Sequence, residues 1–543
     1  MKFSSQNLIF MSALAAILAV TAFILPPTPL WITDNGSKYI IMRTYKEHKT
    51  TKLRHQAPEL APTGGFHIQH HENTLRSFYP EFYPVLCSFF YSKKCERAAA
   101  IPAMLGTLAC AFIVLLWTKS RTLSAAAALG TALFFYSFIL WEMTLSCAAI
   151  TGALYLVLKK KQYLVGGLLM GISIFLREEA YFAAAALALS LAIFKEFKPA
   201  ALFAAGAVAG MIPSWIHQYI EFGHILGLHG KIYIAGTGPQ SAAGILWNYF
   251  HHLLRGEPTG RKFEVLLTVV PTILMIISGI INNKKLKTCS ISLALAGGFI
   301  LLMRYCQSKS FSYAAACSTG FFAAVPAAWI FTADIYRSLT RQAKIYRILA
   351  LFVLISLAAV PAVLTRGDIG LIWSARHFMF LLPSAVILSG KSIKHISPFS
   401  AETNIILASA VAAFAILQQL IGVYSLNTVA KECQLLENTI RKTQTAVVAS
   451  DVFYLPEMTP RIWFENVTVD ISQKENIQKL LELNPREILL VLSTSPQFRR
   501  ISDENLNLLL KNYTIEKPQL FKTPRGTGFI DLVLVKLTLK DNK

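Results

Sequence analysis

The stretch LIFMSALAAILAVTAFILPPTPLWITDNGSKY, residues 8–39, holds the two features that decide the predicted fold. Its first part, residues 8–25, is apolar and long enough to cross a bilayer as a helix. The proline-rich turn that follows is not a small-residue cleavage site, so we expect this segment to be retained as a first transmembrane helix. Shortly after it comes Asp34, a carboxylate at the mouth of the polar loop 26–97. An acid held beside a membrane suggests chemistry on a substrate that the lipid delivers.

The rest of the chain has the composition of a protein that crosses the membrane many times. Of its 543 residues, 54% are hydrophobic and 15% are charged, and the mean hydropathy is +0.48. Ordinary soluble domains carry about 25% charged residues. Apolar runs predict about thirteen transmembrane helices, at 8–25, 98–117, 121–140, 142–158, 162–178, 180–194, 199–220, 263–281, 288–303, 311–332, 345–364, 377–391 and 400–424.

Basic residues occupy every second connection between these helices, as the positive-inside rule requires of a chain whose N-terminus is cytoplasmic. They are Lys119, Arg121, Lys159, Lys160, Lys161, Lys195, Lys198, Lys284, Lys285, Lys287, Arg337, Arg341, Lys344, Arg347, Lys391 and Lys394. Membrane topology therefore explains much of the formal charge of +22, and no nucleic-acid partner is expected. The loops 26–97 and 217–262 and the tail after 425 should lie on the outer side.

Composition divides the chain into a transmembrane domain, residues 1–425, which includes the outer loop 26–97, and a C-terminal domain, residues 426–543. The sequence pattern of the C-terminal domain predicts alternating strands and helices. The strands are expected at 447–448, 488–492 and 529–534, and the helices at 474–483 and 503–511. We therefore expect a polytopic α-helical membrane protein with a small C-terminal α/β domain on the outer, periplasmic side.

The outer loop contains aromatic residues at helix-like spacing between 75 and 90. This spacing predicts either an amphipathic helix in the headgroup layer or an aromatic belt at the end of the second span. Cys87 and Cys95 lie in the same loop and would be able to pair in an oxidising compartment. The sequence leaves the paired and the free states of these thiols open.

Several polar residues fall at the predicted outer ends of the spans, where charges are costly and are functional candidates by default. They are Asp34, Lys38, Tyr39, Glu142, Arg177, Glu178, Trp373, Arg376 and His377. A carboxylate can remove the proton of an attacking hydroxyl, and guanidinium groups can hold a departing phosphate. Asp34 suits the first role, and Arg376 with Arg177 as second choice suits the second. Trp373 and Tyr39 would stack on a sugar or anchor the chain at the interface.

These residues make the chain resemble the GT-C superfamily of membrane glycosyltransferases, near the protein mannosyltransferase and aminoarabinose transferase branch. Asp34 is similar in position to the catalytic acid of those enzymes, which follows the first span. Short stretches also resemble patterns of bacterial members, namely Phe135-Tyr136-Ser137 through Trp141-Glu142, Leu176-Arg177-Glu178 and Trp373-x-x-Arg376-His377 with Pro383.

The resemblance implies an inverting glycosyltransferase that moves a sugar from a polyprenyl-phosphate donor to a lipid-linked glycan, lipid A or a protein. It implies an integral protein of the bacterial inner membrane whose active site faces the periplasm. Asp34 would be the general base, and Glu142 or Glu178 would position its partners or the sugar. His377 would join the donor-phosphate site, and Lys38 the sugar site.

One departure from the superfamily bears on metal binding. Many members carry a second acid directly after the first, whereas Asn35 follows Asp34 here. Functions that need two adjacent carboxylates, including metal binding, are thereby put in doubt. His67, His70 and His71 lie close together but match no standard zinc pattern. We expect no cofactor, with a divalent metal as the less favoured alternative.

Two other classes of protein compete with this interpretation. A transporter or flippase for lipid-linked sugars would show internal repeats and charges near the bilayer midplane, whereas the charges here gather at one face. A polymerase or ligase for surface polysaccharide would concentrate catalytic Arg and His residues in a late outer loop. The early position of Asp34 argues against that class.

Overall fold

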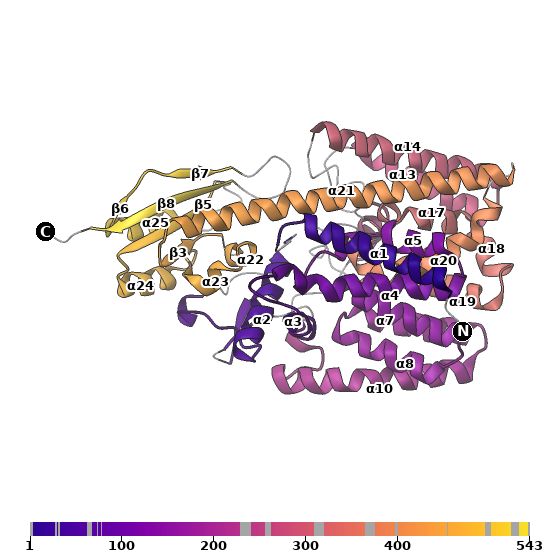
Figure 1. Cartoon of the computed structure of the whole chain (residues 1–543), viewed down its shortest axis with the longest axis horizontal. Helices are drawn as coiled ribbons and strands as arrows, with labels where there is room; N and C mark the ends of the chain where they lie inside the picture. The colour runs from indigo at the N-terminus through magenta and orange to yellow at the C-terminus, as the bar shows by residue number, and fades with distance from the viewer. Residues whose placement is uncertain are drawn as a thin grey trace. The chain divides into compact units, whose positions relative to one another are not determined.

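The computed structural model of the chain describes residues 4–27, 30, 33–61, 68–72, 74–77, 79–228, 241–255, 262–308, 320–363, 375–396, 400–452, 454–494, 501–522 and 531–540. Its contacts divide it into two compact units (Figure 1). The first unit comprises Met1–Ile24 and Ala100–Tyr424, and the second comprises Leu25–Ala99 and Ser425–Lys543. Composition places the loop 26–97 with the spans, but in the structure this loop packs with the C-terminal residues because they share a hydrophobic core.

The first unit is built of helices, several of which run side by side in Figure 1. They are α1 Ser5–Ile24, α4 Ile101–Thr118, α5 Arg121–Leu129, α6 Leu133–Tyr136, α7 Met143–Leu158, α8 Tyr163–Ile172, α9 Glu179–Ile193, α10 Phe197–Phe222, α12 Ala242–Tyr249, α13 Lys262–Ile280, α14 Lys284–Ser308, α16 Phe321–Ala324, α17 Pro326–Ala333, α18 Ile335–Thr340, α19 Lys344–Val363 and α20 Leu382–Ser392. The helix α21, Ala401–Lys442, begins in this unit and ends in the second.

Among the described residues, six helices are long and apolar enough to cross a membrane. They are Ser5–Ile24, Glu96–Thr118, Phe197–Phe222, Lys284–Arg304, Lys344–Val363 and Ala401–Lys442. Shorter apolar helices occupy Met143–Leu158, Tyr163–Phe175, Glu179–Ile193 and Leu266–Ile280. The chain is thus mostly helical with multiple candidate spans, as the sequence predicts, although the described part has fewer full-length spans than the thirteen expected.

Two expected spans are interrupted. The predicted helix 121–140 ends at Leu129, because Gly130 leaves helical geometry and the Thr131 hydroxyl donates to the carbonyl of Ala127 at 2.6 Å. The described part of the predicted span 311–332 forms the short helices α16 and α17. Pro326 begins the second of them, since proline has no N–H to continue a preceding helix but is well suited to a first turn.

The second unit contains a six-stranded sheet with strand order β4-β3-β5-β8-β6, in which β7 also pairs with β8. The strands β3, β4 and β5 are parallel, and β8 is antiparallel to β5, β6 and β7. The elements that follow α21 are β3 Val447–Ser450, α22 Leu455–Met458, α23 Ile462–Glu465, β4 Val467–Asp470, α24 Lys474–Leu483, β5 Glu487–Ser493, α25 Asp503–Lys511, β6 Tyr513–Ile515, β7 Gln519–Phe521 and β8 Leu532–Leu539. The predicted α/β character of the tail is confirmed by these elements.

Apolar residues cover both faces of this sheet and form two cores. One face packs against α24 and α25 through residues such as Ile477, Leu480 and Leu509. The other packs against the end of α21 through Leu436 and Ile440, together with α22 and α23. Amphipathic helices beside alternating strands give this layered arrangement because each element must bury one apolar face.

The loop after the first span is ordered by packing within the second unit. Its elements are α2 Thr33–His48, the 3₁₀ helix η1 Pro58–Leu60, β1 Ile68–His71, β2 Thr74–Ser77, α3 Phe82–Ser88 and the 3₁₀ helix η2 Glu96–Ala100. Trp463 of α23 is fully buried against Ile40, Ile41 and Leu75 of this loop. Its indole N–H donates to the carbonyl of Arg54 at 2.7 Å. These contacts between distant segments explain why the loop belongs to the C-terminal unit.

The single helix expected over 75–90 is wrong in its first part. Residues Thr74–Ser77 form β2, which pairs with β1, and the helix α3 begins only at Phe82. Strand pairing decides the conformation of Thr74–Ser77, and the aromatic spacing alone does not reveal it. Cys87 and Cys95 are both free thiols, the first buried and the second exposed.

Candidate active site

The helix α2 carries three of the residues expected to act on substrate, all within the second unit. Asp34 lies in its first turn rather than in an irregular loop, and only 6% of the residue is exposed. The N-terminus of a helix favours a negative charge. Lys38 follows one turn later and therefore lies on the same side of the helix. It is fully buried, and its ammonium lies 4.7 Å from the centroid of the Tyr79 ring.

The same turn of α2 is pressed against α22. A Cβ atom added to Gly36 would lie 1.6 Å from the carbonyl oxygen of Glu457. The Ser37 hydroxyl donates to Oε1 of Glu457 at 2.9 Å, and both residues are buried. Glycine at this position lets the two backbones approach, and this approach holds the turn that carries Asp34.

Tyr39 occupies another side of α2. Its hydroxyl donates to Oε1 of Glu96 at 2.8 Å and lies 3.3 Å from the hydroxyl of Tyr91. Burial, and then the negative charge of Glu96, raise the pKa of Tyr39 well above its usual value. Only 1% of the residue is exposed, so its ring is packed inside the second unit.

A network of charged side chains lies in the first unit, centred on Arg177. Nη1 of Arg177 lies 3.2 Å from Oε1 of Glu142, which is 3% exposed. The guanidinium also forms a two-pronged pair with Glu179, in which Nε donates to Oε2 at 2.8 Å and Nη2 donates to Oε1. Two carboxylates therefore neutralise one guanidinium, and the fork geometry fixes its plane.

His377 extends this network to the 3₁₀ helix η6, Arg376–Leu381. Nε of Arg376 lies 3.1 Å from Nε2 of His377, and Nδ1 of His377 lies 2.8 Å from Oε1 of Glu179. A guanidinium only donates hydrogen bonds, so Nε2 accepts and the imidazole proton is on Nδ1. The guanidinium of Arg376 also lies 5.7 Å from the ring centroid of Trp141, within the range of a cation–π contact.

The structure changes one assignment within this network. Glu178 was the expected acid of the pair Glu178-Glu179, yet Glu179 is the residue that pairs with Arg177 and His377. Glu178 is the residue before α9, and Glu179 is its first residue. Two consecutive side chains point in different directions, and the sequence contains no signal that decides which one meets a histidine about 200 positions later in the chain.

Other expected residues are placed as follows. Asp34, Lys38 and Tyr39 belong to the second unit, whereas Glu142, Arg177, Arg376 and His377 belong to the first. His252, which was not expected in the site, is 8% exposed, and its ring lies 6.0 Å from that of His377. Trp373 and His67 lie outside the described residues. Within the described ranges, no group of three His, Cys, Asp or Glu side chains is arranged to hold a metal ion.

Comparison with known proteins identifies the fold. No protein-family model matches the chain, and no curated protein matches its sequence. Solved structures, however, show that it has the fold of ArnT. The crystal structure of ArnT from Cupriavidus metallidurans bound to undecaprenyl phosphate is similar over 98% of this chain and 98% of that chain. The TM-score is 0.54 at 11% sequence identity.

The same protein in its apo state gives a TM-score of 0.52, also at 11% identity and over 98% of both chains. At this identity the likeness establishes the fold. The sequence predicts this architecture from the first span, the polar loop with Asp34 and the later spans. The fold comparison confirms that architecture.

Proposed function

We propose that this protein is an integral-membrane glycosyltransferase that moves a sugar from a polyprenyl-phosphate donor to a lipid, glycan or protein acceptor. The observation that carries the proposal is the likeness to ArnT over 98% of both chains, with a buried acid where the resemblance places the catalytic one. That ArnT crystal structure contains undecaprenyl phosphate, which supports a donor of the same chemical class here.

In the proposed reaction, the oxygen of an acceptor hydroxyl attacks the anomeric carbon of the donor sugar. A new carbon–oxygen bond forms on one face while the bond to the phosphate oxygen breaks on the other, so the configuration inverts. The bonding electrons leave with the polyprenyl phosphate, and Asp34 accepts the proton of the hydroxyl. Burial strengthens the electrostatic contacts of this carboxylate, and Lys38 on the same side of α2 would contact the sugar or the acceptor.

Arg376 is the better candidate for the donor phosphate. Arg177 is held by two carboxylates, so its positive charge is largely compensated and it is better suited to positioning. Glu142 and Glu179 would then orient Arg177 and His377, and His377 would orient Arg376. Trp373 retains its proposed role at the sugar, and Glu178 is retained only as an alternative to Glu179.

The proposal includes the membrane arrangement expected from the sequence. The chain would cross a bacterial inner membrane about thirteen times, with its N-terminus cytoplasmic. The second unit, including Asp34, would face the periplasm. The candidate spans described above support the integral-membrane part of this arrangement.

The test is sugar transfer from radiolabelled polyprenyl-phosphate sugars in membranes containing the wild type or Asp34→Asn. Asp34→Asn keeps the shape of the side chain and removes the base, so transfer should fall by at least about a hundredfold. Asp503→Asn is the matched control, because Asp503 also lies in the first turn of a helix of the second unit but is exposed.

A fully active Asp34→Asn protein, at an equal amount in the membrane, would exclude Asp34 as the base. If the wild type transfers no label from any donor but moves lipid-linked sugar across the bilayer, the protein belongs to the flippase class. Arg376→Ala provides a second comparison: it should weaken donor binding as well as turnover, whereas Asp34→Asn should largely spare donor binding.

A further inference from the structure

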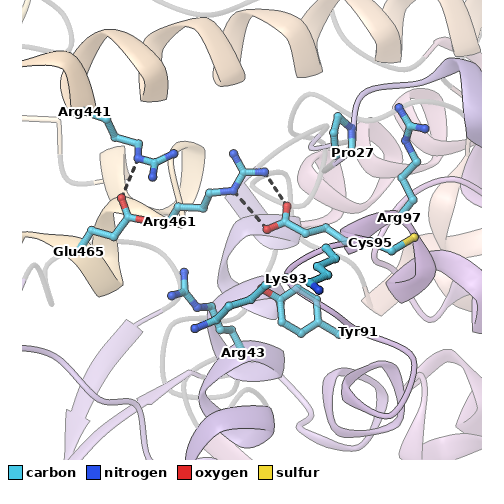
Figure 2. A pocket seen from close by; sticks show the side chains of 11 residues that line it. Pro27, Arg43, Tyr91, Lys93, Cys95, Arg97, Arg441, Arg461 and Glu465 are labelled. Carbon is cyan, nitrogen blue, oxygen red and sulfur yellow. Dashed lines mark hydrogen bonds and ion pairs between the residues drawn. The ribbon is translucent and has the colours of Figure 1, made fainter.

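The second unit contains a pocket that the proposed chemistry does not use (Figure 2). Its volume is about 540 Å³. It is lined by Pro27, Arg43, Tyr91, Lys93, Lys94, Cys95, Glu96, Arg97, Arg441, Arg461 and Glu465. Six of these side chains are cationic and two are carboxylates. The pocket therefore favours an anionic ligand.

Ion pairs hold the guanidinium groups of the pocket in place. Arg461 pairs with Glu96 at 2.6 Å and with Glu437 at 3.1 Å, and Arg441 pairs with Glu465 at 2.8 Å. Figure 2 shows Arg441 and Arg461 entering from the C-terminal elements and Arg43, Lys93 and Arg97 from the N-terminal loop. Although burial opposes its charge, the pairing with Glu96 and Glu437 raises the pKa of Arg461, so it stays cationic.

Two lysines complete the cationic rim. Lys93 lies 2.8 Å from Oε1 of Glu47 and is 67% exposed, and Lys94 is also exposed. Neither residue is needed to neutralise a buried charge. The rim can therefore turn toward an arriving anion, whereas the guanidinium groups behind it are already oriented. Arg461 is compensated by two carboxylates, so it shapes the wall of the pocket. The rim lysines and Arg97 would carry most of the attraction for a phosphate, whose paired oxygens suit a guanidinium fork.

The size of the pocket indicates more than an inorganic anion. A volume of about 540 Å³ falls within the usual range for sites of small organic ligands, about 300–1,000 Å³. The carboxylates of Glu96 and Glu465 can accept hydrogen bonds from hydroxyl groups, which a sugar offers and a bare phosphate does not. We propose that this pocket binds a phosphorylated sugar, namely the anionic headgroup of the acceptor.

The pocket is a site distinct from the one that carries Asp34. The helix α2 contributes Arg43 to the lining, and Tyr39 donates to the lining residue Glu96. Arg43 follows Asp34 by nine positions, which is about two and a half turns of an α-helix and about 13.5 Å along its axis. The two residues therefore lie on opposite sides of α2. The pocket would anchor the acceptor, and it would take no part in proton transfer.

The identification of the ligand as the acceptor rests on the proposed function. The binding of a phosphorylated sugar in the pocket can be tested independently of that function. Cys95 lines the pocket and is exposed, so its alkylation reports occupancy without any catalysis. The purified full-length protein would be treated with N-ethylmaleimide, and the modification of each cysteine would be followed by peptide mass spectrometry. Cys306 is an exposed thiol of the first unit just beyond the candidate span Lys284–Arg304, and it serves as the internal reference.

Glucose 1-phosphate should slow the alkylation of Cys95 by about tenfold at ten times its dissociation constant. The rate at Cys306 should not change, and neutral glucose should protect neither Cys95 nor Cys306. Vesicles containing phosphatidic acid provide the lipid arm. Stronger protection by these vesicles than by glucose 1-phosphate would assign the site to a lipid phosphate. Equal protection by inorganic phosphate and glucose 1-phosphate would show that the sugar is not recognised. Either result would overturn the proposal of a phosphorylated sugar.

The double variant Lys93→Glu/Lys94→Glu should abolish the protection of Cys95. Its matched control is Lys517→Glu/Lys522→Glu, which reverses two exposed lysines of the same unit outside the pocket. Both variants should unfold at the wild-type temperature. The proposal would be overturned if Cys95 is protected equally in the pocket variant and the wild type. It would also be overturned if no phosphorylated probe protects Cys95 in the wild type.

A kinetic experiment then tests the acceptor role. With a phosphorylated acceptor, Lys93→Glu/Lys94→Glu should raise KM by about tenfold or more and leave kcat nearly unchanged, because only binding is lost. Asp34→Asn should be inactive and yet retain the protection of Cys95. An inactive wild type that still shows protection would count against the proposed function alone, and active enzyme without protection would count against the pocket alone.

Discussion

His377 donates a hydrogen bond from Nδ1 to Oε1 of Glu179 at 2.8 Å, although the two residues are 198 positions apart in the chain. The same carboxylate holds Arg177, and Nε2 of His377 accepts from Arg376. The imidazole is thereby held neutral and in one tautomer. Glu179 links the start of α9 to η6, and so connects the residue proposed for the donor phosphate to the buried charges behind it.

Replacing Glu179 should have a much larger effect on catalysis than replacing its neighbour. Glu179→Gln removes the negative charge between Arg177 and His377, so Arg376 loses its orientation. We expect sugar transfer to fall by about a hundredfold, the usual cost of a displacement of about 1 Å in an active site. The matched variant Glu178→Gln should retain transfer within a few-fold. Equal losses in the two variants, measured at equal protein level, would contradict this role of Glu179.

Gly36→Ala should disrupt the contact between α2 and α22. The new Cβ would lie 1.6 Å from the carbonyl oxygen of Glu457, so one of the two backbones must move, at a cost of about 1–3 kcal/mol or more. We expect a lower unfolding temperature of the purified protein and weaker transfer, since Asp34 lies in the same turn. Gly244→Ala is the control, because its nearest neighbour is the Ser241 Oγ at 3.4 Å. A wild-type unfolding temperature for Gly36→Ala would show that the contact is not tight.

The stability of the second unit should decrease in mildly acidic solution because of His55. Its Nδ1 lies 2.7 Å from the carbonyl oxygen of Ala57, and its Nε2 lies 2.8 Å from the hydroxyl of Thr468. Burial lowers the pKa of His55 below its usual value of about 6.5. The unfolded chain therefore binds the proton more readily than the folded one. The stabilisation is complete above about pH 6.5 and is lost as the pH falls toward the lower folded pKa.

Thermal unfolding of wild type and His55→Gln between pH 7.5 and 5.5 would measure this effect. The wild type should lose stability over this interval, and the variant should lose less of it. All other titrating groups are common to both proteins, so the difference between the two curves isolates His55. Parallel curves would contradict the prediction.

Lys287 and Asp334 form a buried ion pair whose loss should destabilise the first unit. Nζ of Lys287 lies 2.7 Å from Oδ1 of Asp334, and the side chains are 1% and 0% exposed. Lys287→Met leaves a buried carboxylate without its counter-charge, at a cost of about 3–5 kcal/mol. Unfolding in detergent should occur at a clearly lower temperature.

Two further variants give this experiment its controls. Lys287→Met/Asp334→Leu should recover most of the loss, because it removes both charges together. Lys285→Met, at an exposed neighbouring position, should be neutral. A double variant that is less stable than Lys287→Met would contradict the assignment of the cost to an uncompensated charge.

Some of the candidate site could be predicted from the residues themselves, and some could not. Asp34, Arg177, Arg376 and His377 were accessible to prediction, because charged residues at the ends of apolar runs are rare and have a recognisable cost. Glu179 was not, because its choice over Glu178 depends on the rotation of α9 against η6. The break at Gly130 and the strand Thr74–Ser77 were also missed, since both depend on contacts that a local pattern does not contain.

The sequence by itself determined the predominance of apolar helices and the α/β elements of the tail. An apolar run or an alternating strand is a property of neighbouring residues, and it persists whatever the rest of the chain does. Only the tertiary structure decided that residues 25–99 join the C-terminal unit, that Trp463 is buried against this loop and that Arg461 lies between Glu96 and Glu437. The contacts of Trp463 with this loop and of Arg461 with Glu96 join segments hundreds of positions apart. Such contacts form only when packing decides which side of each element faces its neighbour.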